Sequence, residues 1–310
     1  MKSVHFASLG AFLLLLQIST ADKILFVLPV ASKSHVNVFE PLIRALGERG
    51  HEIVNLSPVK SPKMPPNELD TYLTESGEDG FILFSLGSIV PARVMPEEYR
   101  QIFVRVFSRL KQRVIWKWET GEMSDAPPNV LIQKWVAQQD VLGHPNIKLF
   151  MTHGGLLSTQ ESAYHGVPLL GFPMFGDQDL NVKQAENAGY AKFFEILELT
   201  EEKLETAINE MLNNTRYMNK AKELSKLVRD LPETPLQKAV YWTEYVLRHK
   251  GATHLRSAAR DLNFFQYYLL DVLLTFFGIA ATILLVAYFV LKRIVKGLCG
   301  KKSTSKVKRQ

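Results

Sequence analysis

The stretch from Lys134 to Asn181 concentrates side chains that could together hold a charged small molecule. It contains Trp135, a His-Gly-Gly turn that starts at His153, a carboxylate at Glu161 and an Asp-Gln pair that starts at Asp177. A tryptophan ring offers a flat surface on which a base can stack. A carboxylate can accept hydrogen bonds from ribose hydroxyls. These residue types at this spacing therefore suggest a nucleotide site.

The elements around these residues follow a regular alternation. Residues 149–151 and 168–172 are apolar runs typical of buried strands, and residues 156–165 have helical spacing that ends at Gly166. A glycine-bearing turn between a strand and a helix presents backbone N–H groups and the positive end of the helix dipole to an anion. We therefore expect His153 and Gly155 to face a diphosphate.

The order W-x-x-Q, H-x-G-x-x-x-x-x-E and D-Q in this stretch resembles the donor-binding signature of the UDP-glycosyltransferases, enzymes with two Rossmann-like domains. The resemblance implies that Trp135 stacks on uracil, that Glu161 binds the ribose, and that Asp177 binds the sugar hydroxyls. Animal members often have Asn where this chain has Leu157. The positions that the resemblance assigns to the UDP-sugar are Ser88, Trp135, Gln138, His153, Gly155, Ser158, Glu161, Asp177 and Gln178.

The first part of the chain reads as a secretion signal followed by one βαβ unit. Residues 1–21 combine a basic start, an apolar run and a small-residue cleavage site. Residues 23–28 predict a strand that is apolar on both faces, as a parallel sheet requires, and residues 52–56 predict the next strand, with a helix from Val38 to about Gly50 between them. His35 then lies in a loop after the first strand. The pattern around it resembles the start of the family's acceptor domain, which implies that His35 is the general base.

Residues 58–80 interrupt this pattern. They are rich in proline and polar residues, and residues 81–86 then resemble the first strand of the family's donor domain. A Rossmann-like domain needs roughly 100 residues to bury a core, so most of the acceptor domain is expected to be missing. Asp70 and Asp79 do not match the aspartate that orients the family's base. A splice variant, a pseudogene product or a faulty gene structure would each leave this pattern.

The end of the chain predicts a membrane anchor. Residues 272–291 are twenty residues without a charge, preceded by clustered aromatic residues and followed by lysine and arginine. The positive-inside rule then places the basic tail in the cytosol and the globular part in the lumen. The tail ends in a K-x-K-x-x pattern typical of retrieval to the endoplasmic reticulum, and Asn213 begins a glycosylation sequon.

The distribution of charge and the cysteine content exclude several kinds of partner and site. The net charge is +6, but the last nineteen residues hold eight Lys or Arg and no acid, so the rest of the chain is mildly acidic. The positive net charge comes from the tail, so it does not indicate that the rest of the chain binds nucleic acid. The single cysteine, Cys299, excludes an internal disulfide and a cysteine-based metal cluster.

Together these features predict an α/β protein with a GT-B-type Rossmann-like donor domain, whose doubly wound parallel sheet follows a truncated acceptor unit and precedes one transmembrane helix. The expected segments are a signal peptide (1–21), an acceptor-domain remnant (22–57), a junction (58–80), a UDP-sugar-binding domain (81–250), an amphipathic juxtamembrane segment (251–271), a transmembrane helix (272–291) and a basic cytosolic tail (292–310).

The resemblance implies inverting transfer of a hexose from a UDP-sugar to the hydroxyl of a small lipophilic acceptor, without a metal or cofactor. The co-substrate would be UDP-glucose or UDP-glucuronate, and the protein would be a detoxifying glycoprotein of the endoplasmic reticulum membrane, single-pass type I. The alternative is a form without turnover that binds UDP-sugar or associates with full-length relatives as a regulator.

Overall fold

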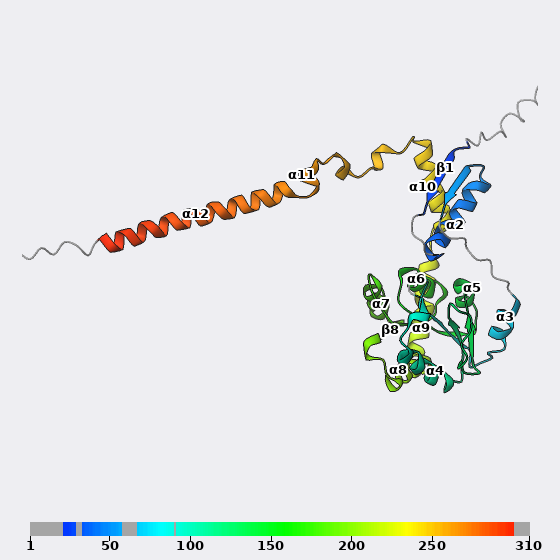
Figure 1. Ribbon diagram of the computed structural model, residues 1–310. Coiled ribbons are helices and arrows are strands. Elements are labelled where there is room, and N and C mark those ends of the chain that lie inside the picture. The colour runs from blue at the N-terminus through cyan, green and yellow to red at the C-terminus, as the bar shows by residue number, and fades with distance from the viewer. Residues whose placement is uncertain (1–20, 29–32, 58–66, 90, 301–310) are drawn as a thin grey trace, which may run out of the picture. The chain divides into compact units, whose positions relative to one another are not determined.

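The computed structural model describes residues 21–28, 33–57, 67–89 and 91–300, which fall into two units, residues 1–242 and 243–310 (Figure 1). Nearly all of the predicted signal peptide, the first part of the predicted junction and the end of the tail lie outside the described residues.

The first unit begins with the predicted βαβ unit. Strands β1 (Lys23–Val27) and β2 (Glu52–Leu56) pair in parallel, and α2 (Lys33–Glu48) connects them. The helix starts earlier than predicted because Val36, expected in a loop, is buried, whereas Val38 is exposed. The loop prediction for His35 is therefore wrong: its backbone lies in the first turn of α2, and its side chain lies outside the described part of the structure.

One face of this two-stranded sheet is exposed. The outward side chains pair across the strands as Leu25 with Val54 and Val27 with Leu56, and they are 59%, 49%, 56% and 57% exposed, respectively. Parallel sheets normally have both faces covered. Strand β1 is apolar on both faces, as predicted, but one of these faces is exposed in this unit.

A six-stranded parallel sheet forms the larger part of the first unit. Its order is β5-β4-β3-β6-β7-β8, and every neighbouring pair is parallel. The chain winds outward in one direction from β3 and in the other from β6, which confirms the doubly wound sheet. The strands are β3 (Phe81–Ser85), β4 (Arg113–Lys117), β5 (Val130–Gln133), β6 (Ile147–Thr152), β7 (Leu169–Gly171) and β8 (Ala191–Phe193).

Helices cover both faces of this sheet because its strands are apolar on both sides. Ile82 and Phe84 of β3 belong to a core shared with α4 and α8, which lie side by side (Figure 1). Phe81 and Leu83 belong to a second core shared with the remaining helices. The helices that follow β3 in this domain are α4 (Glu97–Ser108), α5 (Gln138–Leu142), α6 (Leu156–His165), α7 (Gln178–Asn187), α8 (Glu201–Asn213) and α9 (Thr215–Arg229), with single 3₁₀ turns at Ala92–Val94 and Ile196–Glu198.

An aromatic cluster fills the first core. The Phe84 ring lies 4.6 Å from that of Phe103, 5.2 Å from Trp116 and 6.2 Å from Phe172. Trp116 is fully buried and Trp118 lies against it. Trp116, in β4, and Trp118, just after it, therefore act in packing.

The described part of the predicted junction, residues 67–80, contains α3 (Asn67–Thr74), which packs on the six-stranded sheet. Leu69 and Leu73 are buried in the second core. The Tyr72 hydroxyl donates to the Asn129 carbonyl at 2.8 Å, and Arg113 donates to the Tyr72 carbonyl at 2.7 Å. Burial raises the pKa of Tyr72 to about 12. These contacts make α3 an integral part of the sheet domain.

Tyr72→Phe tests this assignment. The substitution leaves the Asn129 carbonyl without this donor, so we expect the free energy of unfolding to fall by about 1 kcal/mol. Urea denaturation of the detergent-solubilised chain measures it. Tyr164→Phe, at an exposed tyrosine of α6, is the matched control and is expected to be neutral. Equal stability of both variants would show that the hydrogen bond from Tyr72 to Asn129 does not stabilise the contact of α3 with the sheet.

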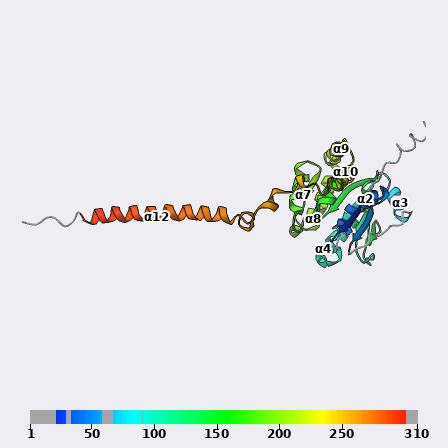
Figure 2. The ribbon, with the colours of Figure 1, turned by 90° about the horizontal axis from the view of Figure 1, so that it is seen from above.

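The second unit leads into a long apolar helix. Helix α10 (Pro235–Arg248) begins in the first unit and ends in the second. Short 3₁₀ turns follow at Thr253–Leu255 and Ala258–Asp261, and then the helices α11 (Phe264–Tyr267) and α12 (Leu270–Gly300). Figure 2 shows α12 as one continuous helix. Residues Leu270–Gly297 are long and apolar enough to cross a membrane, so the helix extends beyond both predicted ends. Aromatic side chains of α11 are exposed beside it.

Candidate functional site

The residues predicted to bind the UDP-sugar follow the carboxyl ends of strands of the six-stranded sheet. Gly87 follows β3 and His153 follows β6, the two central strands from which the chain winds in opposite directions. Ligands of open α/β sheets bind at such a switch point, because the connections on either side diverge and leave a crevice. The topology thus places the His-Gly-Gly turn where a ligand is expected.

Three of the predicted residues are joined by hydrogen bonds. The Gln138 amide, at the start of α5, donates to the Ser158 hydroxyl at 3.2 Å and to the Glu161 carboxylate at 2.7 Å. Gln139 donates to the other Glu161 oxygen at 2.9 Å. Gln139 was not predicted, although it follows Gln138 directly. The carboxylate expected at the ribose is therefore held between two amides.

His153 is largely buried and closely surrounded. A Cβ added to Gly87 would lie 2.5 Å from its ring, and one added to Gly155 would lie 2.7 Å from its Nε2. Burial lowers the pKa of His153 to about 4, with the nearby Asp177 carboxylate acting in the opposite direction. The ring is therefore neutral at pH 7. Its Nδ1 lies 3.2 Å from the Thr152 hydroxyl, which leaves Nε2 for a ligand.

The Asp-Gln pair lies at the N-terminus of α7. The Gln178 side chain is only 4% exposed, and its amide oxygen accepts hydrogen bonds from Met174 N at 2.9 Å and Phe175 N at 3.3 Å. Asp177 is exposed, and its Oδ2 accepts from the Asn181 amide at 2.9 Å. Asp177 therefore faces outward at the end of a turn that the Gln178 side chain stabilises. Because the amide oxygen of Gln178 is already used, only its amide nitrogen could contact a sugar.

Lys117 is a site residue that the sequence analysis missed. It ends β4, is 6% exposed, and donates to Gly87 O and to Glu119 Oε1, both at 2.8 Å. Its ammonium lies 5.6 Å from the centre of the Trp135 ring. A lysine at the carboxyl end of an apolar strand is the signal that could have identified it. Lys117 adds a positive charge between Trp135 and the His153 turn.

Three further predicted residues, Ser88, Trp135 and His35, take no part in the hydrogen bonds described above. Ser88 follows Gly87, next to the carbonyl that Lys117 contacts, and Trp135 lies over Lys117. The side chain of His35 lies outside the described part of the structure. The assignments of all these residues to a ligand remain predictions.

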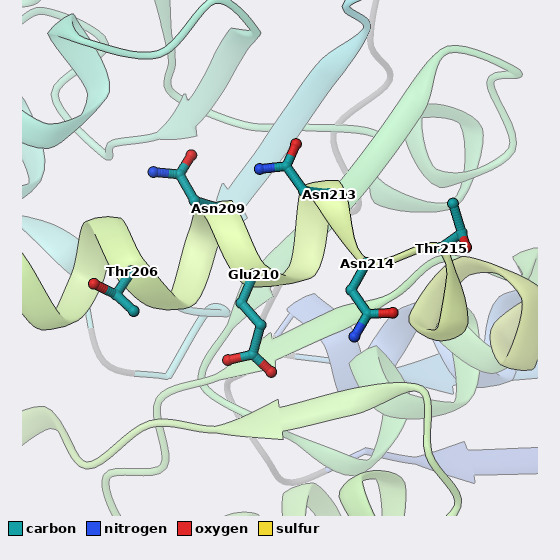
Figure 3. Close-up of a pocket in the computed structure, with 6 residues that line it drawn as sticks. All are labelled: Thr206, Asn209, Glu210, Asn213, Asn214 and Thr215. Atoms are coloured by element: carbon teal, nitrogen blue, oxygen red, sulfur yellow. The ribbon is translucent and has the colours of Figure 1, made fainter.

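The predicted glycosylation site lies elsewhere. Asn213 is the last residue of α8 and is exposed. It borders a shallow hollow of about 690 Å³, where Figure 3 shows its amide on the same side of the helix as that of Asn209. The hollow is lined by Thr206, Asn209, Glu210, Asn213, Asn214 and Thr215.

Comparison with known proteins agrees with the geometry. The model of the family described as "UDP-glucoronosyl and UDP-glucosyl transferase" matches residues 58–310, which include α3 and the whole six-stranded sheet. Residues 1–57 lie outside this match.

Similar proteins occur in several animals. UDP-glycosyltransferase UGT5 of Dactylopius coccus is 40% identical over 241 residues, which is 78% of this chain and 46% of the relative. A UDP-glucuronosyltransferase of Pleuronectes platessa is 40% identical over 76% of this chain and 49% of the relative. UDP-glucuronosyltransferase 2A3 of Homo sapiens is 40% identical over 69% of this chain and 40% of the relative. The chain thus spans less than half the length of these relatives.

A solved structure titled as the glycotransferase of kitacinnamycin aligns with a TM-score of 0.47 and 20% identity, over 69% of this chain and 62% of that one. The family match covers far more than half of the chain. The chain therefore belongs to the UDP-glucuronosyl and UDP-glucosyl transferase family.

Proposed function

We propose that this protein transfers a hexose, glucose or glucuronic acid, from a UDP-sugar to the hydroxyl of a small lipophilic acceptor, with inversion at the anomeric carbon. The observation that carries the proposal is the convergence of Gln138, Ser158 and Glu161 in one hydrogen-bonded group beside the sheet's switch point. A relative named as a UDP-glucosyltransferase is 42% identical and one named as a UDP-glucuronosyltransferase is 40% identical, which supports a UDP-hexose donor and leaves both sugars open.

The donor would lie along the carboxyl edge of the sheet. Trp135 would stack on uracil, Glu161 would bind the ribose hydroxyls, and Asp177 would bind the sugar. The ribose would then compete with Gln138 and Gln139 for the Glu161 oxygens, because both oxygens are already engaged. The remaining predicted positions, Ser88, Gly155 and Ser158, would contact the diphosphate.

The reaction would proceed by direct displacement. His35 would accept the proton of the acceptor hydroxyl, whose oxygen would attack the anomeric carbon as the bond to UDP breaks. Negative charge develops on the leaving diphosphate, and donors aimed at it stabilise the transition state. The N-terminal N–H groups of α6, the Nε2 side of His153 and the Lys117 ammonium supply such donors from this chain.

The role of Lys117 can be measured. We expect Lys117→Gln to weaken UDP binding about tenfold, the effect of losing one charge-assisted hydrogen bond, because the ammonium would face the diphosphate. Binding of uridine, which has no phosphate, is expected to stay unchanged. Isothermal titration calorimetry with both ligands tests this, with Lys111→Gln, at an exposed lysine after α4, as control. An equal loss for uridine would exclude a diphosphate role.

We further propose that α12 anchors the protein in the endoplasmic reticulum membrane as a single-pass type I protein, with the sheet domain in the lumen. The helix length, its apolar composition and the basic residues at its end support this orientation. In that compartment Asn213 would carry a glycan, since it is exposed at a helix end. Loss of a glycosidase-sensitive mobility shift in Asn213→Gln tests both points.

A second candidate function has its own observation. The β1–α2–β2 unit leaves the apolar face of Leu25, Val27, Val54 and Leu56 exposed, as expected for only part of an acceptor domain. In this reading the chain binds UDP-sugar without turnover, and it associates with related transferases as a regulator.

One experiment separates the two candidates. Membranes expressing the 310-residue chain are incubated with radiolabelled UDP-glucose or UDP-glucuronate and a panel of phenols, beside a His35→Ala variant. We expect UDP binding in both proteins and glycoside formation only in the unsubstituted chain. UDP binding without product would favour the second candidate. Absence of UDP binding would contradict both.

A further inference from the structure

We infer that Asn181 is a positioning residue, which holds Asp177 in place by tying it to the His-Gly-Gly turn. The inference rests on the proposed donor site and extends it, since Asn181 lies outside the predicted set of ligand residues. Asn181 lies in the first turn of α7, one helical turn after Asp177.

The polar contacts of Asn181 join two separate loops. Its side chain is 8% exposed, and its amide nitrogen donates to Asp177 Oδ2 at 2.9 Å and to the Gly154 carbonyl at 3.2 Å. A side-chain amide has two N–H groups, so both are used. The buried Asn181 amide thus orients the exposed Asp177 carboxylate. Its second hydrogen bond, to Gly154, fixes the position of that carboxylate relative to the turn after β6.

Close packing beside Asn181 brings α7 near the His-Gly-Gly turn. The next residue, Val182, is fully buried, and a Cβ added to Gly154 would lie 2.2 Å from its Cγ2. A Cβ added to Gly171, at the end of β7, would lie 2.5 Å from the same atom. Only glycines at these two positions allow α7 to approach so closely. The helix therefore sits at a fixed distance from the turn, which keeps the Asn181 amide within reach of the Gly154 carbonyl.

This arrangement has a consequence for ligand recognition. Asp177 accepts from Asn181 through Oδ2, so its Oδ1 could accept a hydrogen bond from a sugar hydroxyl. Without Asn181 the carboxylate would be free to rotate, and its ordering would then oppose binding of the sugar. The contacts proposed for Trp135 with uracil and for Glu161 with the ribose would not depend on Asn181, because these residues precede and lie outside α7.

The test compares affinities for UDP-glucose, UDP-glucuronate and UDP, measured by calorimetry on the detergent-solubilised full chain. We expect Asn181→Ala to lower the affinity for the UDP-sugar about tenfold, the loss of one hydrogen bond to a charged group, while UDP affinity changes less than about threefold. Asn187→Ala replaces an exposed amide at the other end of α7 and is expected to change neither.

A second variant distinguishes positioning from simple support of the fold. Asn181→Asp places a second carboxylate against Asp177, and close like charges favour protonation of one of the pair. Its affinity for the UDP-sugar is therefore expected to recover as pH falls from 7.5 to 5.5, whereas that of Asn181→Ala stays low. An equal loss of UDP and UDP-sugar binding in Asn181→Ala, or an Asp variant without pH dependence, would overturn the inference. Failure of the unsubstituted chain to bind UDP would instead refute the proposed function.

Discussion

Gly154→Ala is expected to lower the free energy of unfolding of the sheet domain by about 2–5 kcal/mol, the sum of two costs. Gly154 has a φ of +83°, a conformation that costs an L-residue about 1–2 kcal/mol. The added methyl group would also lie 2.2 Å from Val182 Cγ2 in a closely packed region, and overpacking of a core typically costs about 1–3 kcal/mol.

Two further glycines separate these costs. Gly77 has a φ of +57° and nothing within 4 Å of an added Cβ, so Gly77→Ala is expected to show the backbone cost alone. Gly171 would meet Val182 at 2.5 Å without a positive φ, so Gly171→Ala is expected to show the steric cost alone. Urea denaturation followed by tryptophan fluorescence measures all three.

A double substitution completes this test. Val182→Ala by itself is expected to destabilise the domain by leaving a cavity, but combined with Gly154→Ala it should recover part of the loss, because the residues are in contact. Strict additivity of the two substitutions would show that the close approach of α7 to the His-Gly-Gly turn is not what requires Gly154.

The second large effect concerns the pH dependence of stability. The pKa of His153 falls from 6.5 to about 4 on folding, so the unfolded chain binds a proton that the folded chain does not between these values. The stabilisation is then complete above pH 6.5 and is lost as pH falls toward 4, by about 3 kcal/mol in total. Binding of a diphosphate would favour the charged ring and would reduce this loss.

Comparison with His153→Asn isolates this contribution. The two proteins share every other titrating group, including His165, whose pKa burial and the nearby Arg229 also lower. The difference between their unfolding free energies, followed from pH 7 to pH 4, is therefore expected to change by about 3 kcal/mol. The Glu97 and Asp125 carboxyls, which Arg100 holds at a pKa of about 2, titrate below this window. A difference that stays constant with pH would show that His153 is not buried as a neutral ring.

Much of the sheet domain follows from local patterns. Helix α6 spans the predicted residues 156–165 and ends at Gly166 in the left-handed conformation, because apolar spacing and a terminal glycine act within a few residues. Strand β2 matches its predicted bounds for the same reason. Thr200 caps α8 because its hydroxyl accepts a hydrogen bond from Lys203 N, three residues later. The order of the donor signature also identified the family, since its spacing needs no tertiary contact to be read.

Other features arise only when distant segments meet. The segment containing α3 is polar and rich in proline, and its helix is stabilised by Arg113, 41 residues after Tyr72. Lys117 becomes a site residue because β4 ends beside the loop that carries Gly87, 30 residues earlier. Asn181 becomes a link because α7 packs on Gly154, 27 residues before it. Sequence spacing determined which residues could bind a nucleotide-sugar, whereas the tertiary structure decided which neighbours hold them, because those hydrogen bonds join parts of the chain with no local pattern in common.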